Sequence, residues 1–312
     1  MAKKKRGQPI DGWVILDKPA GMGSTDVVSA VKRALNAQKA GHGGTLDPFA
    51  TGLLPIALGE ATKTVHYVMD GRKTYRMTLR FGEETTTLDP EGSVVATSDH
   101  RPSDAEINAA LSDFIGDVSQ TPPAYFAIKI NGERAYDLAR AGQDVEMKSR
   151  IVRIDAIRFL SRPDADHVIL EVDCGKGTYI RSLGRDLARS VGTVGSLTAL
   201  RRLSVGPFTE ADAISLDALA QMGHNAPESG GKPYGLLAIE AALDGIPAMV
   251  LSEVETARLR NGQSVSLFRK VDLARIADLK DGDEAVALCG GIAVALVRYG
   301  KGEIRPVRVL NR

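Results

Sequence analysis

Residues 41–59 constrain the fold most, because glycine is dense in this segment and two prolines, Pro48 and Pro55, interrupt it. Glycine loses more conformational freedom on folding than other residues do, and proline removes a backbone donor, so a long regular element is disfavoured here. The segment is therefore predicted to be a structured loop, which carries His42, Thr45 and Asp47.

Strands are predicted on both sides of this loop. Residues 12–16, GWVIL, form a short apolar run that ends in a turn containing Pro and Gly, as a buried strand does. Over 75–81, apolar residues alternate with Arg76, Thr78 and Arg80, which predicts a half-exposed strand. Two further strands are predicted at 151–160 and 167–174.

Helices are predicted where apolar residues recur at helical spacing. In the segment that begins near residue 24, Ser24 or Thr25 is available as the N-cap. A second helix is expected near 104–115, after a loop over 89–104.

A further helix, over 180–190, is expected to bury Ile180, Leu183 and Leu187. Arg181, Arg185 and Arg189 are spaced four apart and share another face of that helix.

The C-terminal part has a different pattern. Residues 222–235 are rich in Gly, Asn, Ser and Pro, so this segment is the best candidate for a linker. Beyond about residue 247, short apolar runs are separated by Gly and Asp, which predicts a small unit of β-strands.

Net charge is +1, so the whole molecule is not a basic clamp for nucleic acid. Any surface that binds nucleic acid must come from local segregation of charge. The one dense basic run, residues 3–6, is typical of a solvated tail, and contact with a polyanion is the alternative.

The cysteine pattern indicates a reducing compartment. Cys174 and Cys289 lie far apart and form no CxxC motif, which also argues against structural zinc. No run of about 20 apolar residues could span a membrane, and no apolar signal core follows the basic N-terminus. A cytoplasmic protein is therefore expected.

Common catalytic motifs are missing or incomplete. The segment 59–64, GEATKT, lacks the second glycine of a phosphate-binding loop, and GHGGTL has Leu46 where a dinucleotide fingerprint needs glycine. The histidines lack metal-ligand spacing, and no G-x-S-x-G motif occurs. The sequence therefore favours chemistry without a nucleotide, metal or other cofactor.

A few residues remain as candidates, and each has an ordinary structural explanation. Asp47 before Pro48 can simply start a turn, and His42 can be a hydrogen-bonded loop residue. Tyr75, Tyr179 and Leu200 can be core residues, and Arg181 can be a solvated charge. From the residues alone both explanations stay open.

Several long blocks, in order, nevertheless resemble one family. The chain is similar to bacterial tRNA pseudouridine-55 synthases of the TruB type over roughly residues 12–208. Departures are Gly43 in GHGGTLDP, where many relatives have Thr, and Phe126 in PPAYFAIK, where Ser is common. The matching blocks are GWVILDKPAGMGSTDVV, AGHGGTLDPFATGLLPIALGEATK, KTYRMTLRFGEETTTLDPEG, QTPPAYFAIKINGERAYDLARAG, CGKGTYIRSLGRDLA and ALRRLSVGPF.

The resemblance implies roles for individual residues. Asp47 corresponds to the catalytic nucleophile, and Arg181 to the arginine that pairs with it. Tyr75 corresponds to the tyrosine that stacks on the target base and helps to move its proton. The remaining residues are substrate-binding: Tyr179 and Leu200 line the uracil site, His42 fills the space that the flipped base leaves, and Lys18 of LDKP supports the site or contacts RNA.

The resemblance also implies a fold. The expected fold class is α+β, with a central mixed, mostly antiparallel sheet flanked by helices and loops, and a small β-rich C-terminal domain similar to PUA modules. The expected divisions are a flexible basic tail (1–9), a catalytic domain (10–236) and an RNA-binding domain (247–312).

The implied activity is conversion of uridine 55 in the tRNA T loop to pseudouridine. The base is flipped out, the glycosidic bond breaks, uracil rotates, and C5 joins C1′. No cofactor is expected, because the reaction is an isomerisation. The expected partner is the T-arm of tRNA, bound by a monomer without a guide RNA. Two alternatives are a non-catalytic RNA-binding or tRNA-folding module and, less favoured, a guide-RNA-dependent synthase.

Overall fold

The computed structural model describes residues 7–123, 129–130, 133–134, 148–224, 235–268, 272 and 274–312. Side chains are described for these residues except those of 129–130, 133–134 and 222–224. Tyr136, Leu138 and Ala139 also predict a helix that ends at Gly142, and this segment lies outside the described part of the chain. The departure at Phe126 and the basic run at 3–6 lie outside it as well.

One large mixed sheet runs through the molecule, and within the described residues it has eleven strands. Only the pairs β1–β14 and β3–β12 are parallel, so the predicted mostly antiparallel sheet is confirmed for these strands. The order of strands along its main path is β14 (Ala213–Ile214), β1 (Gly12–Lys18), β3 (Thr51–Leu58), β12 (Gly195–Val205), β4 (Lys73–Phe81), β11 (His167–Cys174), β10 (Arg150–Ser161) and β7 (Gly116–Gln120). Three short strands lie off this path: β13 (Phe208–Thr209) pairs with β12, β15 (Leu236–Leu237) pairs with β1, and β2 (Ala40–His42) pairs with β3.

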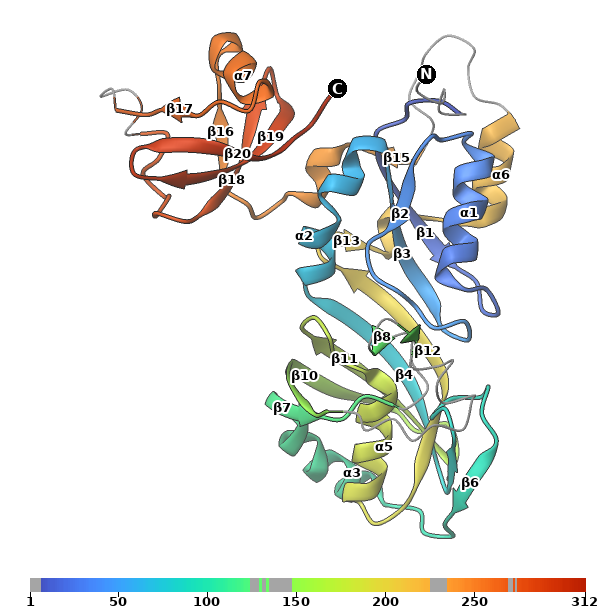
Figure 1. Cartoon of the computed structure of the whole chain (residues 1–312). Coiled ribbons are helices and arrows are strands. Elements are labelled where there is room, and N and C mark those ends of the chain that lie inside the picture. Colours follow the sequence, from blue (N-terminus) through green and yellow to red (C-terminus); the bar gives the residue numbers. More distant parts are fainter. Residues whose placement is uncertain are drawn as a thin grey trace.

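Helices cover parts of this sheet. Figure 1 shows α1 and α6 beside its upper half and α3 and α5 beside its lower half, with β4 and β12 running between the halves. The α-helices are α1 (Ser24–Ala34), α2 (Val65–Asp70), α3 (Asp104–Leu111), α5 (Ile180–Ser190), α6 (Leu216–His224) and α7 (Glu253–Arg260). The 3-10 helices are η1 (Gly59–Lys63), η2 (Ser112–Phe114), η3 (Glu210–Asp212) and η4 (Ile239–Ala242).

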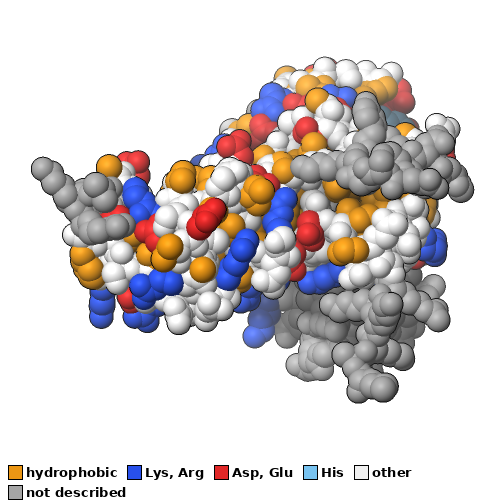
Figure 2. Space-filling model, turned by 90° about the horizontal axis from the view of Figure 1, so that it is seen from above, with side chains coloured by type: hydrophobic (Ala, Val, Ile, Leu, Met, Phe, Trp, Pro, Cys, Tyr) orange, Lys and Arg blue, Asp and Glu red, His pale blue; other side chains and the backbone are white. Residues whose placement is uncertain are grey.

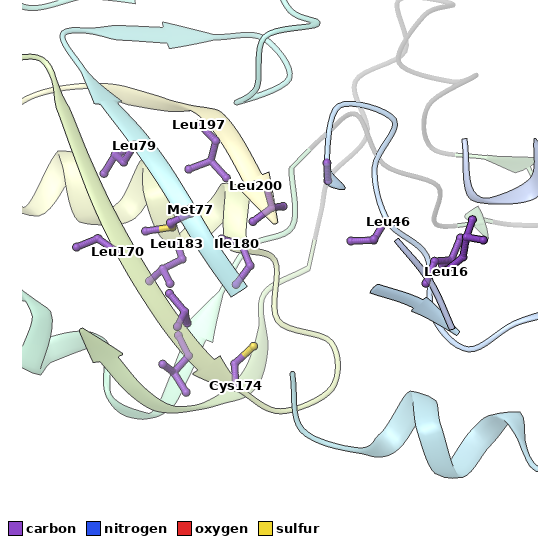
Figure 3. Packing of buried hydrophobic residues seen from close by; sticks show 14 of the residues in the cluster. Leu16, Leu46, Met77, Leu79, Leu170, Cys174, Ile180, Leu183, Leu197 and Leu200 are labelled. Atoms are coloured by element: carbon purple, nitrogen blue, oxygen red, sulfur yellow. The ribbon is translucent and has the colours of Figure 1, made fainter. Parts of the chain in front are cut away.

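Apolar periodicity explains the strands and helices that position the site. Helix α5 buries Ile180, Leu183 and Leu187 as predicted, and packs them against β12 and β4. In Figure 3, Ile180 and Leu183 lie beside Met77 and Leu79 of β4 and Leu197 and Leu200 of β12. The strand predictions for 12–16, 75–81, 151–160 and 167–174 are also confirmed.

The prediction of a loop across all of 41–59 is wrong for residues 41–42, which end strand β2, and for residues 51–58, which form strand β3. Pro55 is tolerated because no residue of β12 or β2 is in register with it, although the N–H of Gly43 donates to its carbonyl oxygen (2.7 Å). Strand β12 pairs only with Thr51 and Gly52, whereas β2 begins to pair at Ile56. The missing N–H of proline therefore interrupts little of the ladder.

Three smaller predictions are also corrected. The N-cap of α1 is Gly23, because Ser24 turns its hydroxyl to the backbone of Leu46 instead. The expected loop over 89–104 contains β6 (Val94–Thr97), which pairs with β5 (Glu83–Thr85). Helix α6 extends to His224, so the start of the linker predicted at 222 is helical. Residues 225–234 of that segment lie outside the described part.

Asn131-Gly132 is a turn signal in the sequence, and short strands flank it. Strands β8 (Lys129–Ile130) and β9 (Glu133–Arg134) pair antiparallel on either side of it. The two turn residues themselves lie outside the described part of the chain.

The C-terminal part forms a second sheet, which confirms the predicted change to short strands. Its order is β16 (Ala248–Val250), β18 (Glu284–Cys289), β19 (Ile292–Gly300), β20 (Glu303–Val309) and β17 (Val265–Ser266). In Figure 1 this sheet extends to one side of the upper end of the large sheet.

The C-terminal sheet shares a hydrophobic core with the large sheet. Trp13 and Phe208 belong to the same buried cluster as Leu296 and Leu310. Polar contacts join the same surfaces: the Tyr67 hydroxyl donates to Glu284 (2.6 Å), and Lys63 donates to the carbonyl oxygen of Val309 (2.7 Å). The second sheet is therefore packed against the first, not joined only by the chain.

Charge is mixed over the face seen in Figure 2, where Lys and Arg side chains alternate with Asp and Glu side chains. This matches the near-zero net charge of the sequence. Among the described residues, no helix is both long and apolar enough to cross a membrane.

Candidate active site

Asp47 lies in the loop between β2 and β3, and the surrounding backbone is fixed from several sides. The Ser24 hydroxyl donates to the carbonyl oxygen of Leu46 (2.8 Å) and accepts from its N–H (2.9 Å). On the other side of Asp47, the Pro48 carbonyl accepts from the N–H of Gly21 (2.8 Å). The carboxylate is thus held on an ordered loop, in the part of the predicted loop that the structure confirms.

The Asp47 carboxylate is paired with Arg181 in side-on geometry. Arg181 Nε lies 3.0 Å from one carboxylate oxygen, and Arg181 Nη2 donates to the other at 3.2 Å. The Arg181 side chain is 6% exposed and that of Asp47 is 20% exposed. The planar guanidinium therefore fixes the orientation of a carboxylate that keeps one side open.

A second carboxylate, Asp89, binds a guanidinium nitrogen of Arg181 that Asp47 does not contact. Arg181 Nη1 donates to Asp89 (2.8 Å) and to the carbonyl oxygen of Thr87 (2.9 Å). The Asp89 side chain is only 2% exposed. Leu88, which lies between Thr87 and Asp89 in the chain, has a φ of +61°, an uncommon conformation for a residue other than glycine. Sequence reasoning missed this role, although the TTTLDPEG block contains Asp89.

Burial and charge act in opposite directions on Asp47. Removal from water raises the pKa of the Asp47 carboxyl above its ordinary value, because the charged form loses solvation, and the charge of Asp89 raises it further. The cations Arg181 and Lys18 oppose this rise. A carboxylate with a raised pKa is more reactive as a base or nucleophile than an ordinary aspartate.

Asp47 opens onto a pocket of about 260 Å³, and the structure brings most of the predicted residues to it. Tyr75, Tyr179, Arg181 and Leu200 all line this pocket with Asp47. Figure 3 shows the two sides of the region, with Leu46 facing Leu200 and Ile180. Burial raises the pKa of the Tyr75 hydroxyl, and Arg202 opposes the rise, so Tyr75 is neutral near pH 7.

Lys18 and His42 do not line the pocket. Lys18 is fully buried, and its ammonium donates to the carbonyl oxygens of Pro19, Met22 and Pro48 at 2.8–3.0 Å. These contacts fit the supporting role predicted for Lys18 and not RNA contact. His42 ends β2, and its Nδ1 is buried without a hydrogen-bond partner among the described residues.

Arg202 is a structural residue of the site that sequence reasoning also missed. Its buried guanidinium donates to Leu53 O (2.7 Å) and Gly44 O (3.1 Å), so it ties the Asp47 loop to β12. Close packing requires glycine at Gly52, where a Cβ would lie 2.2 Å from the Arg202 carbonyl oxygen. Only the long-range pairing of β3 with β12 reveals this arrangement.

The arginine stripe on α5 is already occupied by carboxylates. Arg185 pairs with Asp186, and Arg189 pairs with Glu84, both at 2.8 Å. The family resemblance makes this arginine stripe and Lys129 expected contacts to RNA phosphates. Because Arg181 is buried, the helix does not present three open cations to phosphate. The side chain of Lys129 lies outside the described part. In the part that is described, no group of three or more His, Cys, Asp or Glu could hold a metal ion.

Comparison with known proteins identifies the family. The TruB family pseudouridylate synthase N-terminal domain matches residues 32–180, and the tRNA pseudouridylate synthase B C-terminal domain matches residues 181–244. The chain belongs to the TruB family of pseudouridine synthases. The predicted enzyme class, an isomerase, is thereby confirmed.

Full-length relatives agree with the family models. The tRNA pseudouridine synthase B of Gluconacetobacter diazotrophicus is 53% identical and covers 99% of this chain and 100% of its own. The protein of the same name from Rhodospirillum rubrum is 51% identical, with complete coverage of both chains. That from Caulobacter vibrioides is 50% identical over 100% of this chain and 99% of its own.

Solved structures confirm the fold. A chain of a Cbf5-Nop10-Gar1 complex has a TM-score of 0.74 at 25% identity, covering 96% of this chain and 85% of that one. A chain of an H/ACA RNP bound to a substrate RNA containing 2′-deoxyuridine also has a TM-score of 0.74, at 22% identity, covering 100% and 92%. The pseudouridine-synthase fold expected from the sequence is therefore correct.

Proposed function

We propose that this chain converts uridine 55 in the T loop of tRNA to pseudouridine, with Asp47 as the nucleophile. The observation that carries the proposal is the Asp47 carboxylate, held side-on by Arg181 at the wall of a pocket lined by Tyr75. The names of the full-length relatives support tRNA as the substrate. A module that only binds RNA would not need a buried carboxylate with a fixed orientation.

The chemistry needs one carboxylate and no external reagent. Asp47 attacks C1′, the N1–C1′ bond breaks, and the uracil leaves as an anion that stays in the pocket. After the uracil rotates, C5 attacks C1′ and displaces the Asp47 carboxylate; C5 then loses its proton, and N1 ends with one. Atoms and charge balance, so neither a cofactor nor an energy donor is consumed.

The pocket residues have separate tasks in this proposal. The face of Tyr75 retains the freed uracil while it rotates, and Tyr179 and Leu200 restrict its other positions. Arg181 keeps the carboxylate ionised and oriented, and Lys18 holds the loop beneath it. His42 takes the place of the flipped base within the RNA stack.

The target base must leave its stack to reach Asp47, which costs roughly a few kcal/mol. Contacts between basic side chains and RNA phosphates offset this cost. We assign the catalytic steps to residues 10–236 and additional RNA binding to the β-rich unit at 247–312. In this proposal the protein acts in the cytoplasm, as a monomer that needs no guide RNA.

The test is pseudouridine mapping in a transcribed T-arm stem-loop incubated with the purified protein, a chelator and no nucleotide. Wild-type protein should modify uridine 55, and Asp47→Asn should lose activity by at least about 10³-fold while RNA affinity is retained. Asp117→Asn, on the exposed side of β7, is the matched control and should be as active as the wild type. Equal turnover by Asp47→Asn would falsify the nucleophile assignment, and modification of another uridine would overturn the substrate assignment.

The route at C1′ can be tested separately with RNA that carries deuterium at C2′ of the target. Direct attack predicts no primary isotope effect on the single-turnover rate. A clear primary effect would instead show that Asp47 removes a sugar proton.

A further inference from the structure

Arg150 lines the pocket together with Arg181 and Arg202, and its place in the fold ties it to Tyr179. The Arg150 guanidinium carbon lies 4.3 Å from the centre of the Tyr179 ring, in cation–π geometry. Both residues line the pocket with Asp47. Tyr179 immediately precedes α5, so Arg181, the partner of Asp47, lies two residues further along the chain.

The backbone of Tyr179 is fixed independently of its ring. Gln120 accepts from the N–H of Tyr179 (2.7 Å) and donates to its carbonyl oxygen (3.0 Å). Gln120 on β7 and Arg150 on β10 are direct partners across the two strands. Two residues that face each other across β7 and β10 therefore position Tyr179: Gln120 binds its backbone, and Arg150 lies over its ring.

The rest of the Arg150 guanidinium is only partly engaged. Its Nη2 donates to the carbonyl oxygen of Gly177 (2.8 Å), in the turn that leads to Tyr179. Its Nε is buried and has no hydrogen-bond partner among the described residues. Unlike Arg158 or Arg189, Arg150 has no carboxylate partner among the ion pairs of the described residues. The Arg150 side chain also makes a hydrogen bond with the Tyr179 side chain, so its main contacts are the Tyr179 side chain and the turn before it.

We propose that Arg150 is a positioning residue that fixes the Tyr179 ring as one wall of the uracil pocket. This inference rests on the proposed function, because it assigns the ring a task in holding the flipped base. A guanidinium is planar and can lie flat on the ring while an N–H bonds Gly177. A lysine ammonium is a compact charge and cannot do both. The geometry of Arg150, more than its charge, should therefore matter.

The test compares Arg150→Lys with a matched control, Arg153→Lys, in the same strand but with its charge paired to Asp155 and Asp117. With saturating T-arm RNA, Arg150→Lys should lower the single-turnover rate by about tenfold, because the wall of the pocket is no longer aligned. RNA affinity and its dependence on salt should not change. Arg153→Lys should leave both measurements at their wild-type values.

Double variants show whether Arg150 acts through Tyr179. In a Tyr179→Leu background, which has no ring, Arg150→Lys should cause no further loss of rate. In a Tyr179→Phe background, which keeps the ring, most of the tenfold loss should remain. Additive losses in the Tyr179→Leu background would overturn the proposal.

Two other results would also contradict it. A wild-type rate in Arg150→Lys would show that ring alignment does not depend on the guanidinium. In Arg150→Gln, which removes the charge, weaker RNA binding with a salt slope smaller by about one would make Arg150 a phosphate contact instead.

A readout without activity separates this proposal from the proposed function. The Cζ resonance of Tyr179, assigned by its loss in Tyr179→Phe, should shift in free Arg150→Lys protein and stay unchanged in Arg153→Lys. An unchanged resonance in Arg150→Lys contradicts the ring contact, whatever the activity. If wild-type protein makes no pseudouridine but the resonance shifts, the proposed function fails while the contact is upheld.

Discussion

Arg181 and Arg158 each lie between two carboxylates, and the two arrangements differ mainly in burial. Arg181 joins Asp47 to Asp89 beside the pocket, where its side chain is 6% exposed. Arg158 joins Glu171 to Asp173 on β11, where its side chain is 45% exposed. The residue types and the distances, 2.8–3.0 Å, are similar.

The comparison shows that the surroundings of an ion pair decide what it can do. Around Arg158, water screens the charges and competes for their hydrogen bonds, so the pairs contribute little. Around Arg181, little water competes for the hydrogen bonds, so the three charged groups fix one another in orientation, and Arg181 opposes the rise in the pKa of Asp47. Only the buried arrangement can hold a carboxylate ready for reaction. Substitutions at the two arginines should therefore have very different effects.

The largest effect in this comparison is expected from Arg181→Lys. The charge is kept, but the side-on contact with Asp47 and the contact with Asp89 cannot both form. Single-turnover pseudouridine formation should fall by about 10²-fold, as when one preorganised donor is removed from an active site. A far-ultraviolet circular dichroism spectrum should stay native. A wild-type rate would mean that the orientation of Asp47 does not depend on Arg181.

A smaller effect is expected from Asp89→Asn. Arg181 keeps Asp47 as its counter-ion but loses the charge that anchors it from behind. The rate should fall by about tenfold through misalignment, and urea unfolding should show a loss of about 1–3 kcal/mol for a hydrogen bond to a charged group. Asp117→Asn serves as the control for both measurements. Unchanged activity together with unchanged stability would remove Asp89 from the site.

The smallest effect is expected from Arg158→Gln on the outer face of the sheet. Exposed ion pairs contribute about 0–1 kcal/mol, so urea unfolding should change little. The rate of pseudouridine formation should equal that of the wild type. A loss of activity comparable to that of Arg181→Lys would show that burial is not what distinguishes the two arginines.

Local patterns in the sequence predicted much of the fold. Alternation identified β4 and β11, and helical spacing identified the buried face of α5, because these signals lie within one element. Strand β3 was missed, since Pro55 is acceptable only where β12 and β2 leave a gap. That gap depends on strands far apart in the sequence.

The site was only partly predictable, for the same reason. The composition around Asp47 was equally consistent with a simple turn, and the resemblance to a family singled it out. Asp89 lies 92 residues from Arg181, and Arg202 lies 158 residues from Gly44, so no local pattern connects either pair. Lys18 was placed in the site by its motif, but its burial against three carbonyl oxygens became apparent only in the folded chain.

The acid limb of the pH profile of kcat/KM tests most directly whether an ionised Asp47 drives the reaction. This profile reports the free enzyme, in which burial and Asp89 raise the pKa of Asp47 above its ordinary value of 3.8. Activity should therefore fall as pH drops through a midpoint above 3.8, and Asp89→Asn, which removes a neighbouring negative charge, should move that midpoint to lower pH. Wild-type activity that persists down to pH 3.8, or a midpoint that rises in Asp89→Asn, would contradict the account.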